Sequence, residues 1–263
     1  LQARMRDGRL HPAPIWPDLR TFRGMDWRGK LDCLVAGFPC PPFSTAGKRF
    51  GAADPRNLWP EVGRVIGEIR PHIVFLENVS GLAYPNGGQP SYATVVIGEL
   101  AALGYDARWG IVSARDAGAS HRRDRWWCLG YSKRANIKSP GRNQDAAGWQ
   151  LQARAEDTSE ALGNTNGAGR EGQGPPQPTG LPFPFPPGPT DTDAWGAVLR
   201  ERPDLAPAIG GRLNPMFVEW LQNFPPGWTD IPGATRKHRL EALGDAVVPA
   251  QALLAWRMLT HER

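Results

Sequence analysis

Cysteine is scarce in this sequence, and the three that occur, Cys33, Cys40 and Cys128, lie far apart. No two of them have the spacing of zinc ligands, and an odd number cannot form a disulfide framework, so we expect neither a structural metal nor disulfide bonds. This pattern is typical of a reducing compartment, and we expect a cytoplasmic protein. No apolar run approaches the roughly 18 residues of a membrane-spanning helix, and no charged-then-apolar leader opens the chain, so no membrane partner is predicted.

Charge of one sign is not in large excess either. The chain has 31 Lys and Arg against 26 Asp and Glu, which leaves a formal net charge of +5. A mild positive excess suits an anionic partner such as nucleic acid, but it is also common in proteins that bind none. A length of 263 residues favours one catalytic domain with a smaller appendage over two equal domains.

The first half of the chain alternates short apolar runs with amphipathic segments. The predicted strands are 31–36, 73–76, 107–112 and 125–131, and the predicted helices are 57–70 and 92–103. Continuous apolar strands separated by amphipathic helices are typical of a buried parallel sheet that is covered on both faces. The sequence therefore predicts an α/β fold, in which the loops after the strands meet at one edge and bind ligands.

Composition changes after Ser132. Residues 133–211 are rich in Gly, Pro, Gln, Asn, Thr and Arg, and no helical or alternating period is visible there, which indicates an irregular domain or a partly disordered insertion. Helical patterns return at 214–221 and 249–259. The predicted organisation is a first catalytic part at 1–132, an inserted region at 133–211 and a return to the catalytic domain at 212–263.

Two strand ends carry groups capable of chemistry. Cys40, between Pro39 and Pro41, follows the first strand, and Glu77 ends the second. Because both loops lie at one edge of the sheet, we expect the thiol and the carboxyl group to face each other there. The flanking prolines restrict the backbone and would hold the thiol in one direction. Taken singly, Cys40 could also be an inert core residue and Glu77 a solvated strand end.

A basic segment precedes the last of these strands. Arg123 and Arg125 alternate in it, so their side chains would point the same way in an extended chain. Guanidinium groups lower the pKa of a nearby thiol and bind phosphate or a carbonyl group in a forked geometry. By itself, the segment could equally be a solvated basic loop.

In this order and at these spacings, three segments resemble the cytosine-5 DNA methyltransferases. That family has a Pro-Cys loop ending in Ser, a Glu-Asn-Val tripeptide and a Gln-x-Arg-x-Arg segment, which are similar to 39–44, 77–79 and 121–125 here. Three further segments look like the family's cofactor-adenine loop, its segment after the recognition region and its terminal element; these are 17–22, 221–228 and 244–249. The resemblance covers most of the chain outside 133–211.

The resemblance implies a Rossmann-like class I methyltransferase sheet and a role for each matched residue. Cys40 would add to carbon 6 of cytosine, Glu77 would bind ring nitrogen 3, Arg125 would contact the ring carbonyl and Arg123 the backbone near a flipped nucleotide. Further substrate contacts would come from Phe38, Ser44, Asn78 and Val79. The methyl donor would be S-adenosyl-L-methionine, without a metal, and its site would include Asp18, Leu19, Pro39, Leu58, Asp245 and Val247.

The sequence departs from the family pattern in several places. Pro41 and His121 stand where Gln is usual, which leaves the thiol, carboxyl and guanidinium groups intact. Asp245 stands where Asn is usual and places a carboxylate beside the cofactor. The glycine-rich loop and the acid that hold the methionine and ribose parts are not found, so we expect the sheet to be N-terminally truncated by about 40 to 60 residues.

The sequence thus predicts an enzyme that methylates carbon 5 of cytosine in double-stranded DNA, with residues 133–211 reading base edges in the major groove. We expect a monomer that would suit a bacterial or phage modification system with a cognate restriction endonuclease. Two alternatives stay open: a catalytically inactive DNA-binding fragment without a complete cofactor site, and a tRNA cytosine-5 methyltransferase. The first reading is favoured because a protein that only binds DNA has no need for the thiol of Cys40 and the carboxyl group of Glu77.

Overall fold

The computed structural model describes five stretches of the chain. These are residues 1–39, 57–85, 90–133, 151–152 and 185–260. The chain divides into two compact units. The sheet unit contains Leu1–Val112, Asp124–Ala153 and Ala255–Arg263, and the second unit contains Ser113–Arg123 and Arg154–Leu254. The three-part domain organisation expected from the sequence stays a prediction.

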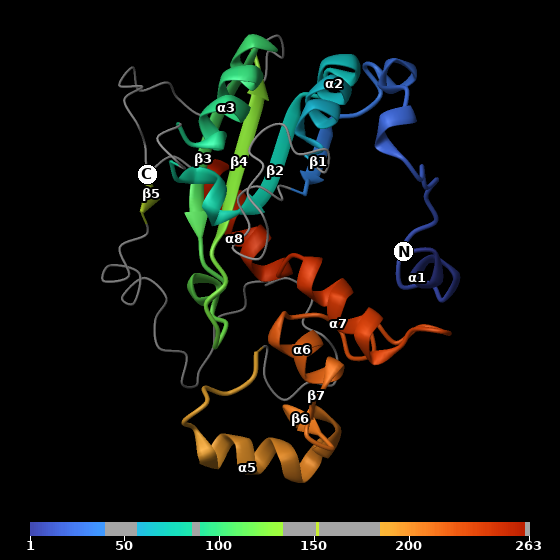
Figure 1. Cartoon of the computed structure of the whole chain (residues 1–263), viewed down its shortest axis with the longest axis vertical. Helices are drawn as coiled ribbons and strands as arrows, with labels where there is room; N and C mark the ends of the chain where they lie inside the picture. Colours follow the sequence, from blue (N-terminus) through green and yellow to red (C-terminus); the bar gives the residue numbers. More distant parts are fainter. Residues whose placement is uncertain (40–56, 86–89, 134–150, 153–184, 261–263) are drawn as a thin grey trace, which may run out of the picture. The chain divides into compact units, whose positions relative to one another are not determined.

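Five strands form one sheet in the sheet unit (Figure 1). They are β1 (Cys33–Gly37), β2 (Ile73–Val79), β3 (Tyr105–Val112), β4 (Arg125–Ser132) and β5 (Leu151–Gln152), in the order β1-β2-β4-β3-β5. β1 is parallel to β2 and β5 is parallel to β3, whereas β4 is antiparallel to both of its neighbours. The predicted α/β class is confirmed, and each of the four predicted strands is present.

The expectation of a wholly parallel sheet is wrong for β4. Parallel neighbours need a crossover connection, usually a helix, because the chain must return to the start of the sheet. Between β3 and β4 the chain has only the residues 113–124, with one short 3-10 turn, η6 (Arg115–Ala117). The chain therefore turns back directly, and β4 fills the position between β2 and β3 in the reversed direction.

Two helices cover one face of the sheet. α2 (Trp59–Ile69) and α3 (Tyr92–Ala102) confirm the two helices predicted in the first half of the chain. α2 ends at Arg70, which adopts the left-handed conformation with φ 57°. Buried side chains of both helices and of the strands pack into one apolar cluster, which includes Phe38, Trp59, Val62, Ile66, Val74, Leu76, Val96, Leu100, Trp126 and Cys128.

The opposite face of β2 and β4 carries aromatic side chains. Phe75 stacks on Trp127 with ring centroids 5.1 Å apart, and it meets the edge of Trp256 at 5.2 Å. Trp256 comes from α8 (Pro249–Thr260), whose last residues belong to the sheet unit. Because side chains alternate along a strand, Glu77 projects from the same face of β2 as Phe75.

β1 differs from the buried strand that the sequence predicts. Its side chains alternate between exposed and half-buried, and Val35 remains 70% exposed. Leu34 and Ala36 face the apolar core, whereas Val35 projects from the opposite face; among the described residues β1 also has a neighbouring strand, β2, on one side only. One face of this apolar strand is thus open in the part of the chain that the structure describes.

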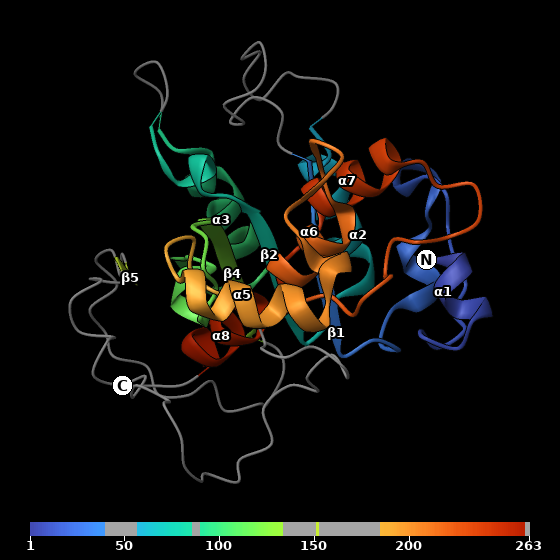
Figure 2. The same cartoon turned by 90° about the horizontal axis from the view of Figure 1, so that it is seen from below.

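The second unit is built from short helices and one hairpin. Among the described residues its elements are η6, α5 (Thr192–Glu201), η7 (Pro203–Leu205), β6 (Ala208–Ile209), β7 (Arg212–Leu213), α6 (Pro215–Leu221), α7 (Arg236–Asp245) and the start of α8. Val198 of α5, Leu205 of η7 and Trp220 of α6 form one apolar cluster, and Figures 1 and 2 show the two helices. The helices predicted at 214–221 and 249–259 are confirmed as α6 and α8.

The absence of any helical period in 133–211 is wrong for α5. Asp191 caps this helix by accepting a hydrogen bond from the backbone N–H of Ala194 at 3.0 Å. Trp195, Val198 and Leu199 follow at the i, i+3, i+4 spacing of one helix face. This helical pattern is short and lies beside a proline-rich stretch, so the composition of the whole region did not indicate a helix. The rest of the segment predicted to be irregular, 133–211, falls outside the described residues at 134–150 and 153–184.

Candidate active site

Glu77 and Arg125 form an ion pair at the end of the sheet. The register places Arg125 of β4 opposite Val79, so it lies diagonally across from Glu77 on the same face of the sheet. The Nε atom of Arg125 is 3.0 Å from Oε1 of Glu77, and the two side chains are 17% and 16% exposed. The structure therefore brings together two of the four residues predicted to be catalytic, in surroundings where charges attract more strongly than in bulk water.

Gly37 makes room for this carboxylate. It is paired with Glu77 across β1 and β2, and a Cβ atom added to Gly37 would lie 3.0 Å from Oε2 of Glu77. A larger residue would push the carboxylate away from the strand. Glu77 consequently lies against the carboxyl end of β1, from which the chain continues toward Cys40. Cys40, Pro41 and Ser44 fall outside the described residues, so the predicted meeting of thiol and carboxyl group stays a prediction.

The chain leaving β1 is attached to β2 and α2. The side-chain amide of Asn78 donates a hydrogen bond of 2.8 Å to the carbonyl of Phe38, and Asn78 is buried. The ring of Phe38 packs on that of Trp59, with centroids 5.3 Å apart. Asn78 and Trp59 thus hold Phe38 in place, at the start of the segment that leads to Cys40. Val79 is half-buried and Pro39 is exposed, and substrate or cofactor contacts of these residues stay predictions.

Arg123 binds main-chain carbonyls within the second unit. Its Nη2 atom donates to the carbonyls of Gly244 and Ala246 at 2.8 and 2.7 Å, and its own carbonyl accepts a hydrogen bond of 2.6 Å from the buried Gln251. Arg123 therefore holds the turn that contains Asp245, which is exposed. Its predicted contact with a nucleotide backbone stays a prediction, as does the cofactor contact of the half-buried Val247.

His121 precedes this arginine by two residues. Burial, and then the charge of Arg123, lower the pKa of its imidazole from the usual 6.5. Neither ring nitrogen has a hydrogen-bond partner among the described residues. The structure therefore favours the neutral form of His121, at a position where the resembled family has an uncharged glutamine.

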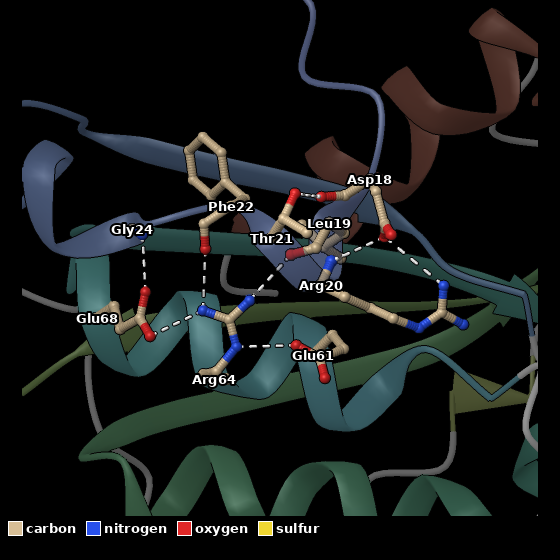
Figure 3. A network of polar contacts seen from close by, with 9 residues as sticks. All are labelled: Asp18, Leu19, Arg20, Thr21, Phe22, Gly24, Glu61, Arg64 and Glu68. Carbon is tan, nitrogen blue, oxygen red and sulfur yellow. Dashed lines mark hydrogen bonds and ion pairs between the residues drawn. The ribbon is translucent and has the colours of Figure 1, made fainter.

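The segment predicted to lie near the adenine forms a short turn beside α2 (Figure 3). Leu19 opens the 3-10 turn η1 (Leu19–Thr21) and packs against the sheet unit's core. Asp18 caps this turn by accepting a hydrogen bond of 3.0 Å from the backbone N–H of Arg20. Leu58, another predicted cofactor residue, lies half-buried just before α2.

Sequence reasoning missed three residues that shape these features. Gly37 accommodates the Glu77 carboxylate, Gln251 binds the Arg123 carbonyl, and Arg64 binds the turn at Leu19. A signal existed for Arg64, because Glu61 and Glu68 stand three residues before and four after it on one helix. Nothing local distinguishes Gly37 or Gln251, since their partners are remote in sequence.

The described residues contain no group of three or more His, Cys, Asp or Glu side chains that could hold a metal ion. In that same part of the chain, we find no helix with the length and apolar character required to cross a bilayer.

Comparison with protein families gives a match over more than half of the chain. The model of the C-5 cytosine-specific DNA methylases matches residues 11–167. Type II methyltransferase M.NgoMIV of Neisseria gonorrhoeae is 42% identical over 108 residues, which are 41% of this chain and 34% of that protein. Type II methyltransferase M.CviJI of Paramecium bursaria Chlorella virus IL3A is 35% identical over 122 residues, 46% of this chain and 32% of that protein. The match thus spans about a third of the length of these relatives.

Comparison with solved structures supports the fold. A DNMT2 mutant of Spodoptera frugiperda superposes with a TM-score of 0.59 at 14% sequence identity, covering 99% of this chain and 88% of that one. At this identity the likeness shows the architecture alone.

Proposed function

Because the chain belongs to the C-5 cytosine-specific DNA methylase family, we propose that it carries the catalytic site of a DNA (cytosine-5-)-methyltransferase. The observation that supports this most is the Glu77–Arg125 pair, which lies against Gly37, three residues before Cys40. Three residues of extended chain span at most about 10 Å, so the length of this segment allows the Cys40 thiol to approach the carboxylate. A pyrimidine ring can bridge a separation of that order.

The proposed reaction needs a nucleophile because carbon 5 of cytosine is unreactive by itself. The Cys40 thiolate adds to carbon 6, and the ring electrons that this bond displaces make carbon 5 nucleophilic. Glu77 binds ring nitrogen 3, and Arg125 donates to the ring carbonyl. After carbon 5 takes the methyl group, its proton passes to a base, and the bond between carbon 6 and the Cys40 sulfur breaks. The target base must leave the duplex, at a cost of a few kcal/mol.

S-adenosyl-L-methionine would supply the methyl group when bound. The turn at Asp18 fits the adenine end of such a molecule, because one carboxylate oxygen caps the turn while the side chain stays 48% exposed. An ionised carboxylate accepts about four hydrogen bonds, so capacity remains for an external amino group. Leu19, Pro39, Leu58, Asp245 and Val247 complete the proposed set. The open face of β1, with Val35 exposed, supports the idea that a segment outside the described residues completes this side of the sheet.

The proposed substrate is double-stranded DNA, bound by a monomer in the cytoplasm. The region proposed to read its bases, 133–211, falls outside the described residues up to 184, apart from β5. Contacts with DNA phosphates make affinity fall with increasing salt, and we expect that dependence here. A cognate restriction endonuclease would be the functional partner, since two similar proteins bear the name Type II methyltransferase.

A covalent trap tests the proposal. Duplex DNA containing 5-fluorocytosine, incubated with the full-length gene product and S-adenosyl-L-methionine, should form an adduct that survives denaturing electrophoresis, since the fluorine cannot leave as the proton does. Cys40→Ser should abolish the adduct. Cys33→Ser is the matched control, because Cys33 is an exposed cysteine on β1, and it should form the adduct normally.

Three results would contradict the proposal. They are no adduct with the full-length protein, an adduct that persists in Cys40→Ser, and an adduct with 5-fluorocytosine in tRNA but not in duplex DNA. The first would favour a DNA-binding protein without catalysis, and the third a tRNA methyltransferase.

A further inference from the structure

Arg64 of α2 joins two acidic side chains to two main-chain carbonyls. Its Nε atom lies 2.8 Å from Glu61, and Nη1 lies 2.8 Å from Glu68. The other bonds leave the helix: Nη1 donates to the carbonyl of Phe22 at 3.0 Å and Nη2 to that of Leu19 at 2.9 Å. Figure 3 shows the guanidinium group between the helix and the turn, with its nitrogens directed to both.

The turn that Arg64 binds is small and is closed by local hydrogen bonds: the Asp18 carboxylate accepts from the Arg20 N–H at 3.0 Å, the Thr21 hydroxyl donates to the Asp18 carbonyl at 3.0 Å, and the Trp16 indole donates to Thr21 at 2.9 Å. η1 contains three residues, closed by the backbone hydrogen bonds from Thr21 to Asp18 and from Phe22 to Leu19, at 3.1 and 3.2 Å. A single turn of this kind is unstable in isolation, because it orders several residues for few hydrogen bonds. The local bonds shape the turn, and Arg64 together with the apolar contact of Leu19 with the core attaches it to α2 and the sheet unit.

Glu68 extends the attachment to the end of the segment. One of its oxygens binds Arg64, and the other accepts a hydrogen bond of 2.7 Å from the backbone N–H of Gly24. A Cβ atom at Gly24 would come within 3.0 Å of the Glu68 side chain, so only glycine allows this approach. Residues 19 to 24 are thus held at both ends by neighbouring positions of one helix.

The geometry of a guanidinium group is required for this arrangement. Arg64 uses three nitrogens toward four acceptors, and the planar group holds them in fixed directions. The hydrogen bond that Arg64 donates to Glu61, and then the one it donates to Glu68, raise the pKa of Arg64, so the charge is retained. A lysine would keep the charge but offers one nitrogen, which cannot reach both carbonyls and both carboxylates.

We propose that Arg64 is a positioning residue of the S-adenosyl-L-methionine site, acting through Leu19 and Asp18 without touching the cofactor. The inference rests on the proposed function, in which these two residues contact the adenine ring. By fixing the carbonyls of Leu19 and Phe22, Arg64 determines where the Asp18 carboxylate stands. Adenine is then recognised by a rigid turn. A more mobile turn should reduce the binding preference for adenine over a ring that lacks its amino group.

The test compares two inhibitors by calorimetry on the full-length gene product. S-adenosylhomocysteine carries adenine, and S-inosylhomocysteine carries an oxygen in place of the amino group. The wild type should prefer the first at least tenfold, and Arg64→Lys should reduce that preference to about threefold or less. Arg70→Lys is the matched control: Arg70 also donates from α2 to backbone carbonyls, those of Gly67 and Leu103, away from the turn. It should leave the preference unchanged.

Hydrogen exchange of the unliganded protein gives a second readout. In Arg64→Lys, the peptide covering 18–22 should exchange faster than in the wild type or in Arg70→Lys, with the strands unchanged. If Arg64→Lys folds poorly, Glu68→Gln serves instead, because it retains an acceptor for Gly24 while removing the charge that fixes Arg64.

The outcomes separate this inference from the proposed function. Equal affinity of the wild type for the two inhibitors, or an undiminished preference in the Arg64 and Glu68 variants, overturns the positioning role. Either result leaves the proposed function intact as long as the wild type forms the 5-fluorocytosine adduct through Cys40. A wild type that forms no adduct contradicts the proposed function, and with it the inference.

Discussion

Each of the two units contains a glutamate paired with an arginine, and the two glutamates differ in how completely protein encloses them. Glu219 on α6 is 0% exposed. It accepts hydrogen bonds from the backbone N–H groups of Gly227 and Thr229 at 2.7 and 2.8 Å, from the Thr229 hydroxyl, and from Arg239 at 3.2 Å. Such a carboxylate holds a loop to a helix and has no face left for a ligand.

Glu77 in the sheet unit is placed differently. Its side chain keeps 16% of its surface exposed, at a strand end beside the chain that leads to Cys40. Burial alone therefore does not tell a structural carboxylate from a functional one. What distinguishes them is where the carboxylate stands: Glu77 keeps exposed surface at the end of a strand, whereas Glu219 has none. On this reasoning, Glu219 should govern stability and Glu77 should govern activity.

The largest effect is expected at Glu77. Glu77→Gln keeps the shape of the side chain but removes the charge, and it should lower kcat for methyl transfer about 10²- to 10⁴-fold, the usual contribution of a general acid–base group. The variant also removes the charged partner of Arg125, which is 17% exposed, so we expect some loss of stability as well, and activity is measured at a temperature at which the variant remains folded. Transfer of a radiolabelled methyl group and thermal unfolding measure the two quantities. Activity of Glu77→Gln within threefold of the wild type would contradict a functional role of Glu77 that Glu219 lacks.

The second effect is expected at Glu219. Glu219→Gln should lower the free energy of unfolding by about 3 kcal/mol, because it removes the buried carboxylate from its pair with Arg239 and leaves that arginine paired with the exposed Asp230, at 3.5 Å. Urea denaturation followed by fluorescence measures this change. The control is Glu241→Gln, since Glu241 is 3.7 Å from Lys237 in an exposed pair, and such pairs contribute at most about 1 kcal/mol. Equal losses in the two variants would contradict the structural role of Glu219.

A smaller effect is expected at Gly37. In Gly37→Ala the new Cβ atom would approach Oε2 of Glu77 to 3.0 Å, so the carboxylate must move by a few tenths of an ångström. We expect kcat to fall roughly tenfold, because small misplacements of reacting groups are costly. Gly98→Ala on α3 is the control, since nothing lies within 4 Å of its added Cβ, and it should leave kcat unchanged. Equal kcat in Gly37→Ala and Gly98→Ala would show that Gly37 does not help to position Glu77.

The smallest effect concerns pH and His121. Burial lowers the pKa of this imidazole below its usual 6.5 in the folded state. As the pH falls, the imidazole of the unfolded chain therefore binds a proton before that of the folded protein does. The free energy of unfolding should consequently decrease from about pH 7 down to the pKa of His121 in the folded protein. Melting temperatures of the wild type and of His121→Gln, measured between pH 5 and 8, should converge at the alkaline end. A parallel decrease in both proteins would show that other groups cause it.

Much of the sheet unit could be predicted because its signals are local. The apolar runs of β1 and β2, the period of α2 and the glycine after α3 are visible in short windows of sequence. The second unit was harder, since α5 follows a proline-rich stretch and α7 has few apolar positions. Val35 shows the limit of a local signal: the run that contains it is typical of a buried strand, yet the residue lies at an edge.

The candidate site shows a similar division. Glu77 and Arg125 were predicted from motif and topology, and the structure brings them to 3.0 Å. The bonds of Arg123 to the carbonyls of Gly244 and Ala246 could not be predicted, because they join residues more than 120 positions apart. A sequence indicates that a guanidinium group is present, but many carbonyls could accept from it.

By itself, the sequence determined the α/β class, the positions of the main strands and the set of groups capable of cytosine chemistry, because periodicity and residue type are local properties. The tertiary structure decided the reversed direction of β4, the open face of β1 and the partners of Arg64, Arg123 and Glu219. Those features depend on which distant segments pack together, and that choice is made by strand register and by the burial of apolar side chains over the whole fold.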